Sequence, residues 1–239
     1  MFGISNASQY ADTWGNESDF LESHGIYEKL AELVPDGNVL EVGCGVGNGT
    51  QYLVKSNKVL SLDSNESLIK TAQERFKNKC IESSIIQCDL FDLTESVIEE
   101  ISSFMPRTIV GWFIGSNGED IFSRTEEEND ISNKSKLYRE KIEDIIVSND
   151  LCTDSVDYIH LVNRGVTADG FTKEELFKDT KDDYDQWVFK PAGFEVVSVE
   201  QLLWPRDGSE FAYGESPNPN FVGGNITPSI TSIIAKRIE

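Results

Sequence analysis

Apolar residues in the first half of the chain fall into short blocks separated by longer polar stretches. The blocks have the length of buried strands, and the stretches between them carry apolar residues at the three- and four-residue spacing of a helix. We therefore predict strands at residues 38–43, 58–63, within 83–93 and at 107–115, the last of them apolar throughout, as in a central parallel strand. The intervening helices are predicted at residues 17–34, 48–55, 66–76 and 96–104.

The second half continues this alternation less regularly. Residues 116–133 are polar and predict a loop, and residues 205–225, rich in Pro, Gly and Asn, predict a second one. The other elements predicted here are a helix at 134–147, a strand at 157–162, a helix that begins at the capping-box sequence 172–175, a strand within 191–204 and a closing antiparallel strand at 230–238.

Strands that alternate with helices of this length predict an α/β fold, with an open, doubly wound, mostly parallel sheet and right-handed crossovers. No internal repeat or linker divides the chain. We expect one domain over residues 1–239, with an N-terminal cap segment at about 1–35 and an insertion at about 116–155.

The net charge of −21 is the strongest compositional signal. Nucleic acid would be repelled by such a surface unless a basic patch overrode it, and the lysines and arginines are scattered, so we expect no nucleic-acid partner. The acidity either serves solubility or attracts a cationic small molecule or peptide. No apolar run is long enough to span a bilayer, no secretory signal is visible, and the four cysteines show no CxxC spacing, so we expect a cytoplasmic protein without a membrane partner.

The sequence VLEVGCGVGNGT, residues 39–50, lies where the first predicted strand turns into a helix. In an open α/β sheet this turn is the usual contact for a ligand. Gly43, Gly45 and Gly47 would let the backbone approach a ligand closely, although a purely structural turn is the simpler alternative. Asn48 stands where a dinucleotide fingerprint has its third glycine, and Glu41 would repel a phosphate but accept an ammonium group.

These residues resemble the class I S-adenosylmethionine-dependent methyltransferases. The resemblance is carried by LEVGCGVG, by DSNESLIKTAQERF from Asp63 onwards, by QCDLFDL, and by GFEVVSVEQLLW followed by ITSIIAKRI. It covers residues 25–115 well and 157–239 in outline. It implies a seven-stranded sheet whose last two strands form a hairpin, with S-adenosyl-L-methionine bound at the turn after the first strand.

The resemblance also implies roles for individual residues. The methionine part of the cofactor would be surrounded by Glu41 and the backbone of Gly43, Gly45 and Gly47, and its carboxylate reached by the hydroxyl of Tyr10. The ribose would be held by Asp63, and the adenine would meet Ser64, Asp89 and the backbone N–H of Leu90. Each has an alternative: Asp63 or Ser64 could be a helix N-cap, Asp92 could replace Asp89, and Tyr10 could be a packed loop aromatic.

The acceptor side is less informative. His160, near the end of the predicted strand 157–162, could be a general base or a buried, hydrogen-bonded strand histidine. The (D/N)PP(Y/F) sequence of methyltransferases that act on nucleic-acid amino groups is missing after the fourth strand. Acceptor contacts could come from aromatic residues, namely Trp112, Phe113, Trp187, Trp204, Phe211 and Tyr213. No metal-binding constellation is visible, so we expect no metal.

The sequence therefore predicts methyl transfer from S-adenosylmethionine to oxygen or nitrogen of a small-molecule acceptor, which could be cationic. An NAD-dependent Rossmann oxidoreductase is the first alternative, disfavoured by Glu41 and Asn48. A non-catalytic S-adenosylmethionine-binding module is the second. The oligomeric state stays open.

Overall fold

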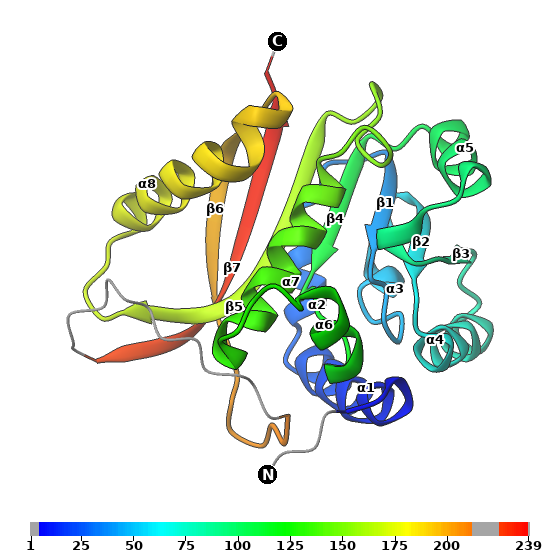
Figure 1. Cartoon of the computed structure of the whole chain (residues 1–239), viewed down its shortest axis with the longest axis horizontal. Coiled ribbons are helices and arrows are strands. Elements are labelled where there is room, and N and C mark those ends of the chain that lie inside the picture. Colours follow the sequence, from blue (N-terminus) through cyan, green and yellow to red (C-terminus); the bar gives the residue numbers. More distant parts are fainter. Residues whose placement is uncertain (1–4, 212–224, 239) are drawn as a thin grey trace.

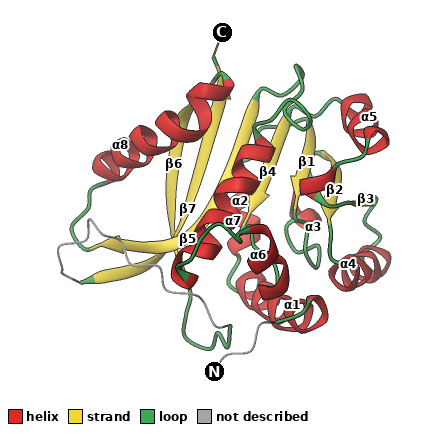
Figure 2. Cartoon of the chain, in the orientation of Figure 1, coloured by secondary structure: helices red, strands yellow, loops and turns green. Residues whose placement is uncertain are grey.

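The computed structural model describes residues 5–211 and 225–238, and its strands form one seven-stranded sheet (Figures 1 and 2). Their order across the sheet is β3-β2-β1-β4-β5-β7-β6. The strands are β1 (Asn38–Val42), β2 (Lys58–Asp63), β3 (Ser84–Gln87), β4 (Thr108–Trp112), β5 (Tyr158–Ala168), β6 (Phe194–Leu203) and β7 (Ile226–Arg237). All pairings are parallel except those of β7, which lies antiparallel between β5 and β6. This topology confirms the predicted fold class, including the C-terminal hairpin.

Helices flank the sheet on both faces (Figure 1). The α-helices are α1 (Ala7–Ser23), α2 (Ile26–Ala31), α3 (Thr50–Leu53), α4 (Glu66–Lys79), α5 (Glu95–Phe104), α6 (Gly118–Arg124), α7 (Ile131–Ile146) and α8 (Lys173–Tyr184). Two 3₁₀ turns, η1 (Leu90–Asp92) and η3 (Lys190–Ala192), and a π-helical turn, η2 (Asp185–Phe189), complete the described elements.

Two hydrophobic clusters lie on opposite faces of the sheet, because successive side chains of a strand point to opposite sides. In β1, Leu40 and Val42 pack with residues of α5 and α7, whereas Val39 packs with residues of α1, α2 and α4. Leu40 and Val42 of one cluster, and Val39 and Val110 of the other, are all at most 1% exposed. The central strands are therefore covered on both sides, which is why their sequences are almost continuously apolar.

Where one helix is predicted at residues 17–34, the structure has two. α1 ends at Ser23, and α2 begins after Gly25, whose φ of +69° is left-handed. α1 also begins earlier than predicted, because the Asn6 side chain caps it in a reciprocal capping box with Gln9. The apolar spacing continues across the break, so the periodicity alone did not reveal it.

The predicted loop at 116–133 contains the helix α6. Asn117 caps it by accepting a hydrogen bond from the Asp120 backbone N–H at 3.1 Å, and Asp120 pairs with Arg124 one turn later. A capping residue and an ion pair four residues apart can be recognised in the sequence of a short polar helix. The prediction of a loop did not take them into account.

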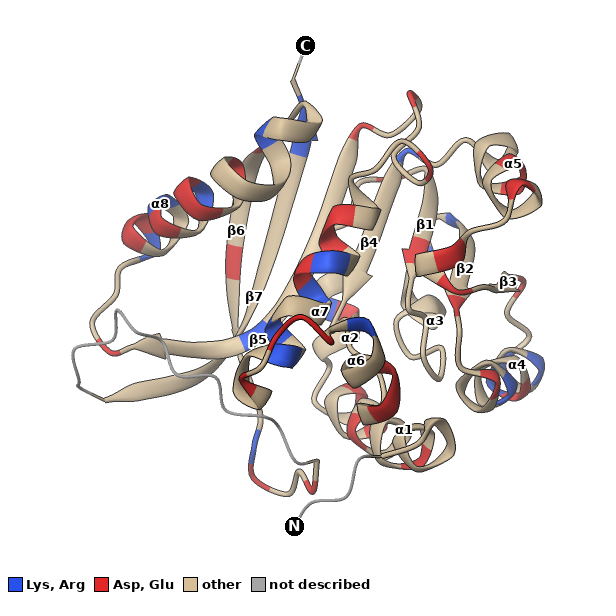
Figure 3. Ribbon diagram, in the orientation of Figure 1, with Lys and Arg blue, Asp and Glu red and all other residues tan. Residues whose placement is uncertain are grey.

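The acidic surface is mixed rather than uniform. Figure 3 shows acidic and basic residues interspersed on α4 and α8. Among the described residues, the longest apolar helical stretch falls short of what a membrane crossing needs. Clusters of His, Cys, Asp and Glu suited to a metal ion are likewise missing from residues 5–211 and 225–238.

Candidate active site

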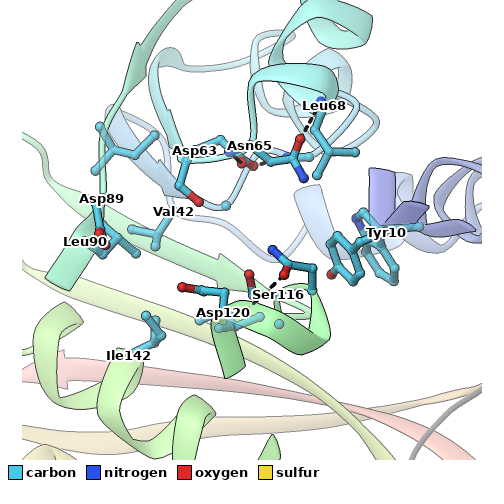
Figure 4. Close-up of a pocket in the computed structure, with 18 of the residues that line it drawn as sticks. Tyr10, Val42, Asp63, Asn65, Leu68, Asp89, Leu90, Ser116, Asp120 and Ile142 are labelled. Atoms are coloured by element: carbon cyan, nitrogen blue, oxygen red, sulfur yellow. Dashed lines mark hydrogen bonds between the residues drawn. The ribbon is translucent and has the colours of Figure 1, made fainter. Parts of the chain in front are cut away.

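A cavity of about 580 Å³ lies at the carboxyl ends of β1, β2, β3 and β4 (Figure 4). Figure 4 shows Asp63 and Asn65 on one side of it, Ser116 and Asp120 opposite, and Asp89 and Tyr10 toward its two ends. A space of this volume is typical of a site for a small ligand or cofactor. The lining comes from α1, the ends of the four strands, α4, η1, α6 and α7.

Two glycines of the predicted loop line this cavity. Gly43 has a φ of +76°, and a Cβ added to it would meet nothing within 4 Å. Gly45 has a φ of +55° and an added Cβ would lie 3.1 Å from Nε1 of Trp14. The left-handed backbone therefore requires glycine at both positions, and the space beside Gly43 is left open to the cavity.

Gly47 has a different role from the predicted one. It does not line the cavity, and a Cβ added to it would lie 2.6 Å from Cε1 of Phe76 and 3.2 Å from Cβ of Ala72. Gly47 therefore allows α4 to pack closely against the loop, and the approach of its backbone to a cofactor stays a prediction.

Asp63 ends β2 and faces the cavity with its carboxylate held by the backbone. Its Oδ2 accepts a hydrogen bond from the Gly45 N–H at 2.8 Å, and its Oδ1 accepts one from the Asn65 N–H at 2.9 Å. Burial raises the pKa of this carboxyl group. The N-cap of α4 is Asn65, which accepts from Ser67 and Leu68, so the capping alternative for Asp63 and Ser64 is wrong. Both line the cavity instead.

Asp89 and Leu90 line the end of the cavity that lies away from Tyr10 (Figure 4). Asp89 Oδ1 accepts a hydrogen bond from the Phe91 N–H at 3.0 Å, and Oδ2 forms an ion pair with Arg124. Asp92, the alternative acid, is not among the lining residues. The structure thus brings Gly43, Asp63 and Asp89 around one cavity, as the sequence predicted.

A model of the methyltransferase domain matches residues 39–103. The matched segment runs from β1 into α5 and contains the glycine loop, Asp63 and Asp89. This match, together with the order of the strands, supports the class I S-adenosylmethionine-dependent methyltransferase family for this chain.

A curated relative matches part of the chain. A stretch of 91 residues is 30% identical to "Putative methyltransferase 235L" of Invertebrate iridescent virus 6, over 36% of this chain and 34% of that protein. The chain thus matches about a third of the length of this curated relative. The strands and helices after residue 103 lie outside the family match.

Solved methyltransferase structures resemble the whole chain weakly. A TehB-like S-adenosylmethionine-dependent methyltransferase from Corynebacterium glutamicum has 15% sequence identity and a TM-score of 0.48, covering 95% of this chain and 98% of that one. Magnesium protoporphyrin IX methyltransferase from Synechocystis has 13% identity and a TM-score of 0.48, covering 99% of this chain and 90% of that one. Similarity this low carries no information about what this chain acts on.

Glu41 lies beside the main cavity of the methyltransferase domain, not in it. It borders a crevice of about 20 Å³ and is 5% exposed. Its Oε2 accepts hydrogen bonds from Oγ1 of Thr50 at 2.6 Å and Oγ of Ser61 at 2.7 Å. Burial raises the pKa of Glu41 from 4.5 to about 7, against the opposing effect of the two hydroxyl donors.

This pKa predicts a pH-dependent stability. The folded state binds the Glu41 proton more tightly than the unfolded chain, so the contribution to stability is present below pH 4.5 and is lost as the pH rises through about 7. Relative to Glu41→Gln, the wild type should lose up to about 3 kcal/mol of unfolding free energy across this range. Urea unfolding of both proteins at pH 5 and pH 8 measures the difference, and parallel pH profiles would contradict it.

The cap helix α1 covers the glycine loop. Tyr10 and Trp14 both line the cavity, with ring centroids 6.5 Å apart and planes 7° from parallel. Asn48, 1% exposed, fixes this helix by donating to Oγ of Ser18 at 3.1 Å and Oδ1 of Asp19 at 2.7 Å. Asn48, which stands where a dinucleotide fingerprint has its third glycine, therefore connects α1 to the glycine loop through hydrogen bonds. The role of the Tyr10 hydroxyl toward a cofactor carboxylate stays a prediction.

His160 does not meet the cavity, which contradicts its expected role as a general base. It is 0% exposed and lies within β5, opposite Val110 in the register. Its Nδ1 accepts from Nε1 of Trp112 at 3.3 Å, and its Nε2 is 2.8 Å from Oγ of Ser232. Burial lowers the pKa of His160 to about 3, so both ring nitrogens serve the core and the ring stays neutral.

Of the six aromatic residues considered for the acceptor, Trp112 and Phe113 line the cavity. Trp187 is 69% exposed on the turn after α8, and Trp204 and Phe211 are not among the lining residues. Tyr213 lies outside the described residues. The insertion also contributes lining residues that were not predicted from the sequence, chiefly Asp120 and Tyr138.

Proposed function

We propose that this methyltransferase transfers the methyl group of S-adenosylmethionine to oxygen or nitrogen of a small-molecule acceptor. The observation that supports it most is the convergence of Gly43, Asp63 and Asp89 on one cavity at the strand ends. The two carboxylates can accept hydrogen bonds from the hydroxyl groups and the amine of the cofactor. The open space beside Gly43 lets the cofactor approach the backbone closely.

In this proposal Asp63 accepts hydrogen bonds from the ribose hydroxyls and Asp89 from the exocyclic amine of the adenine. The bare backbone at Gly43 admits the methionine part, and the hydroxyl of Tyr10 donates to its carboxylate. When bound, the cofactor supplies an electrophilic methyl group on a sulfonium. Trp14 and Phe113 would help exclude water from that group, which favours an in-line displacement.

The cavity also supports a choice of acceptor. Its charged lining residues are Asp63, Asp89 and Asp120, and no lysine, arginine or histidine of the described segments lines it. Aromatic rings beside carboxylates favour neutral or cationic ligands over anionic ones. We therefore propose a neutral or cationic acceptor. The four cysteines, all free, fit the proposal of a reducing, cytoplasmic setting.

The oxidoreductase alternative is less well supported. A pyrophosphate would need the free backbone donors at the start of the helix after β1. There the Glu41 carboxylate accepts a hydrogen bond from the side-chain hydroxyl of Thr50, the first residue of α3, and its Oε1 lies 2.9 Å from the position of a Cβ on Gly49. α3 is also only four residues long. An acidic side chain that carries negative charge above about pH 7 at this point disfavours a diphosphate.

Calorimetric titration with S-adenosylmethionine and S-adenosylhomocysteine tests the cofactor, and transfer of a labelled methyl group to a panel of amines, phenols and carboxylates tests the reaction. We expect binding of both cofactor forms and label on a neutral or cationic member of the panel. Absence of binding would refute the proposal. Binding with no transfer to any member would instead favour the non-catalytic module, and an NADH fluorescence change on mixing would favour the oxidoreductase.

A further inference from the structure

Four side chains form a connected polar network at the Asp89 end of the cavity. Arg124 of α6 is paired with Asp89 and, through Nε, with Oδ1 of Asp120 at 3.3 Å. Oδ2 of Asp120 accepts a hydrogen bond from the Tyr138 hydroxyl at 2.7 Å. We call Asp89, Arg124, Asp120 and Tyr138 the Arg124 network. Three of its members line the cavity, and Arg124 is not among the lining residues.

Arg124 is itself held in place on several sides. Its guanidinium carbon lies 4.7 Å from the centroid of the Phe91 ring, and its backbone oxygen accepts a hydrogen bond from Nζ of Lys141 in α7 at 2.7 Å. The side chain is 33% exposed, against 41% for Asp89. A planar guanidinium that engages two carboxylates and a ring has little freedom to rotate.

The network leaves Asp89 in a defined orientation. One carboxylate oxygen accepts from the Phe91 N–H and the other is bound to Arg124, yet each oxygen has a second lone pair available. Without Arg124, only the backbone hydrogen bond would restrain the carboxylate, and an exposed, uncompensated Asp89 would turn toward water.

We propose that Arg124 is a positioning residue that orients Asp89 toward the exocyclic amine of the cofactor base, and thereby sets the preference for adenine over hypoxanthine. This inference rests on the proposed function. Hypoxanthine carries a carbonyl where adenine carries the amine, so an oriented Asp89 would meet an acceptor instead of a donor. A freely rotating Asp89 would distinguish the two bases less well.

The test compares S-adenosylhomocysteine with its deaminated analogue, S-inosylhomocysteine, by calorimetric titration. A hydrogen bond to a charged group corresponds to roughly 10- to 100-fold in affinity, so the wild type should prefer the adenine form by at least about 10-fold. In Arg124→Met this preference should fall to about 3-fold or less, chiefly through weaker binding of the adenine form. Arg124→Lys should recover only part of it, because an ammonium group is a point charge without the planar fork.

Arg107→Met is the matched control, because Arg107 also pairs with an exposed aspartate, at 3.1 Å from Asp157, but lies at the N-terminal side of β4. It should leave the preference unchanged. If Arg124 only holds α6 in place, Arg124→Met should lower the affinities for both ligands equally and leave their ratio unchanged. That result would overturn the inference. If Arg124→Met does not fold, an unaltered ratio in Arg124→Lys overturns it. Failure of the wild type to bind either ligand would instead refute the proposed function.

Discussion

Asp63→Ala should lower the affinity for S-adenosylhomocysteine by at least about 100-fold. In the proposed complex its carboxylate accepts from two ribose hydroxyls, and each hydrogen bond to a charged group contributes about 1.5–3 kcal/mol. The substitution also removes the acceptor of the Gly45 N–H, which lies 2.8 Å from Oδ2, so the glycine loop loses a restraint at the ligand. Titration calorimetry measures the loss directly.

Two further variants make the Asp63 result specific. Asp63→Asn keeps the size and one acceptor oxygen, so we expect a smaller loss than in Asp63→Ala. Asp157→Ala removes an aspartate paired with Arg107. Asp157 directly precedes β5, at the end of the strands away from the cavity, so this variant should leave the affinity unchanged. Unchanged affinity in Asp63→Ala, with circular dichroism showing a folded protein, would remove Asp63 from the site.

Gly47→Ala should destabilise the fold by about 2–4 kcal/mol. The new methyl group would lie 2.6 Å from Cε1 of Phe76, and the φ of +79° is unfavourable for any residue with a Cβ. Overpacking costs about 1–3 kcal/mol and the left-handed backbone about 1 kcal/mol more. For a chain of this length the corresponding decrease in Tm is roughly 5–15 °C, which differential scanning calorimetry resolves.

Gly43→Ala is the matched partner of this variant. Its φ of +76° carries the same backbone cost, but the added Cβ meets nothing within 4 Å. We expect a loss of stability of only about 1 kcal/mol, together with weaker cofactor binding, since Gly43 lines the cavity. Equal losses of stability in the two variants would contradict the separate roles assigned to these glycines.

Much of the cofactor half could be predicted because its signals are local. Strand β4 is apolar since both of its faces are covered, and Asp63 directly follows an apolar run that ends at the ligand edge of the sheet. The insertion was predicted less well. α6 is short and polar, so no apolar period marks it, and Arg124 reaches Asp89 across 35 positions of sequence.

The sequence by itself determined the alternation of strands and helices, the glycine loop at the end of β1, the acid that ends β2 and the acid that follows β3, because these depend on neighbours a few residues apart. The tertiary structure decided which side of each element meets the cavity. Gly47 faces Phe76 of α4, His160 faces Ser232 of β7, and Asp89 meets Arg124 of α6. Each contact joins distant segments, and only close packing of the folded chain brings them together.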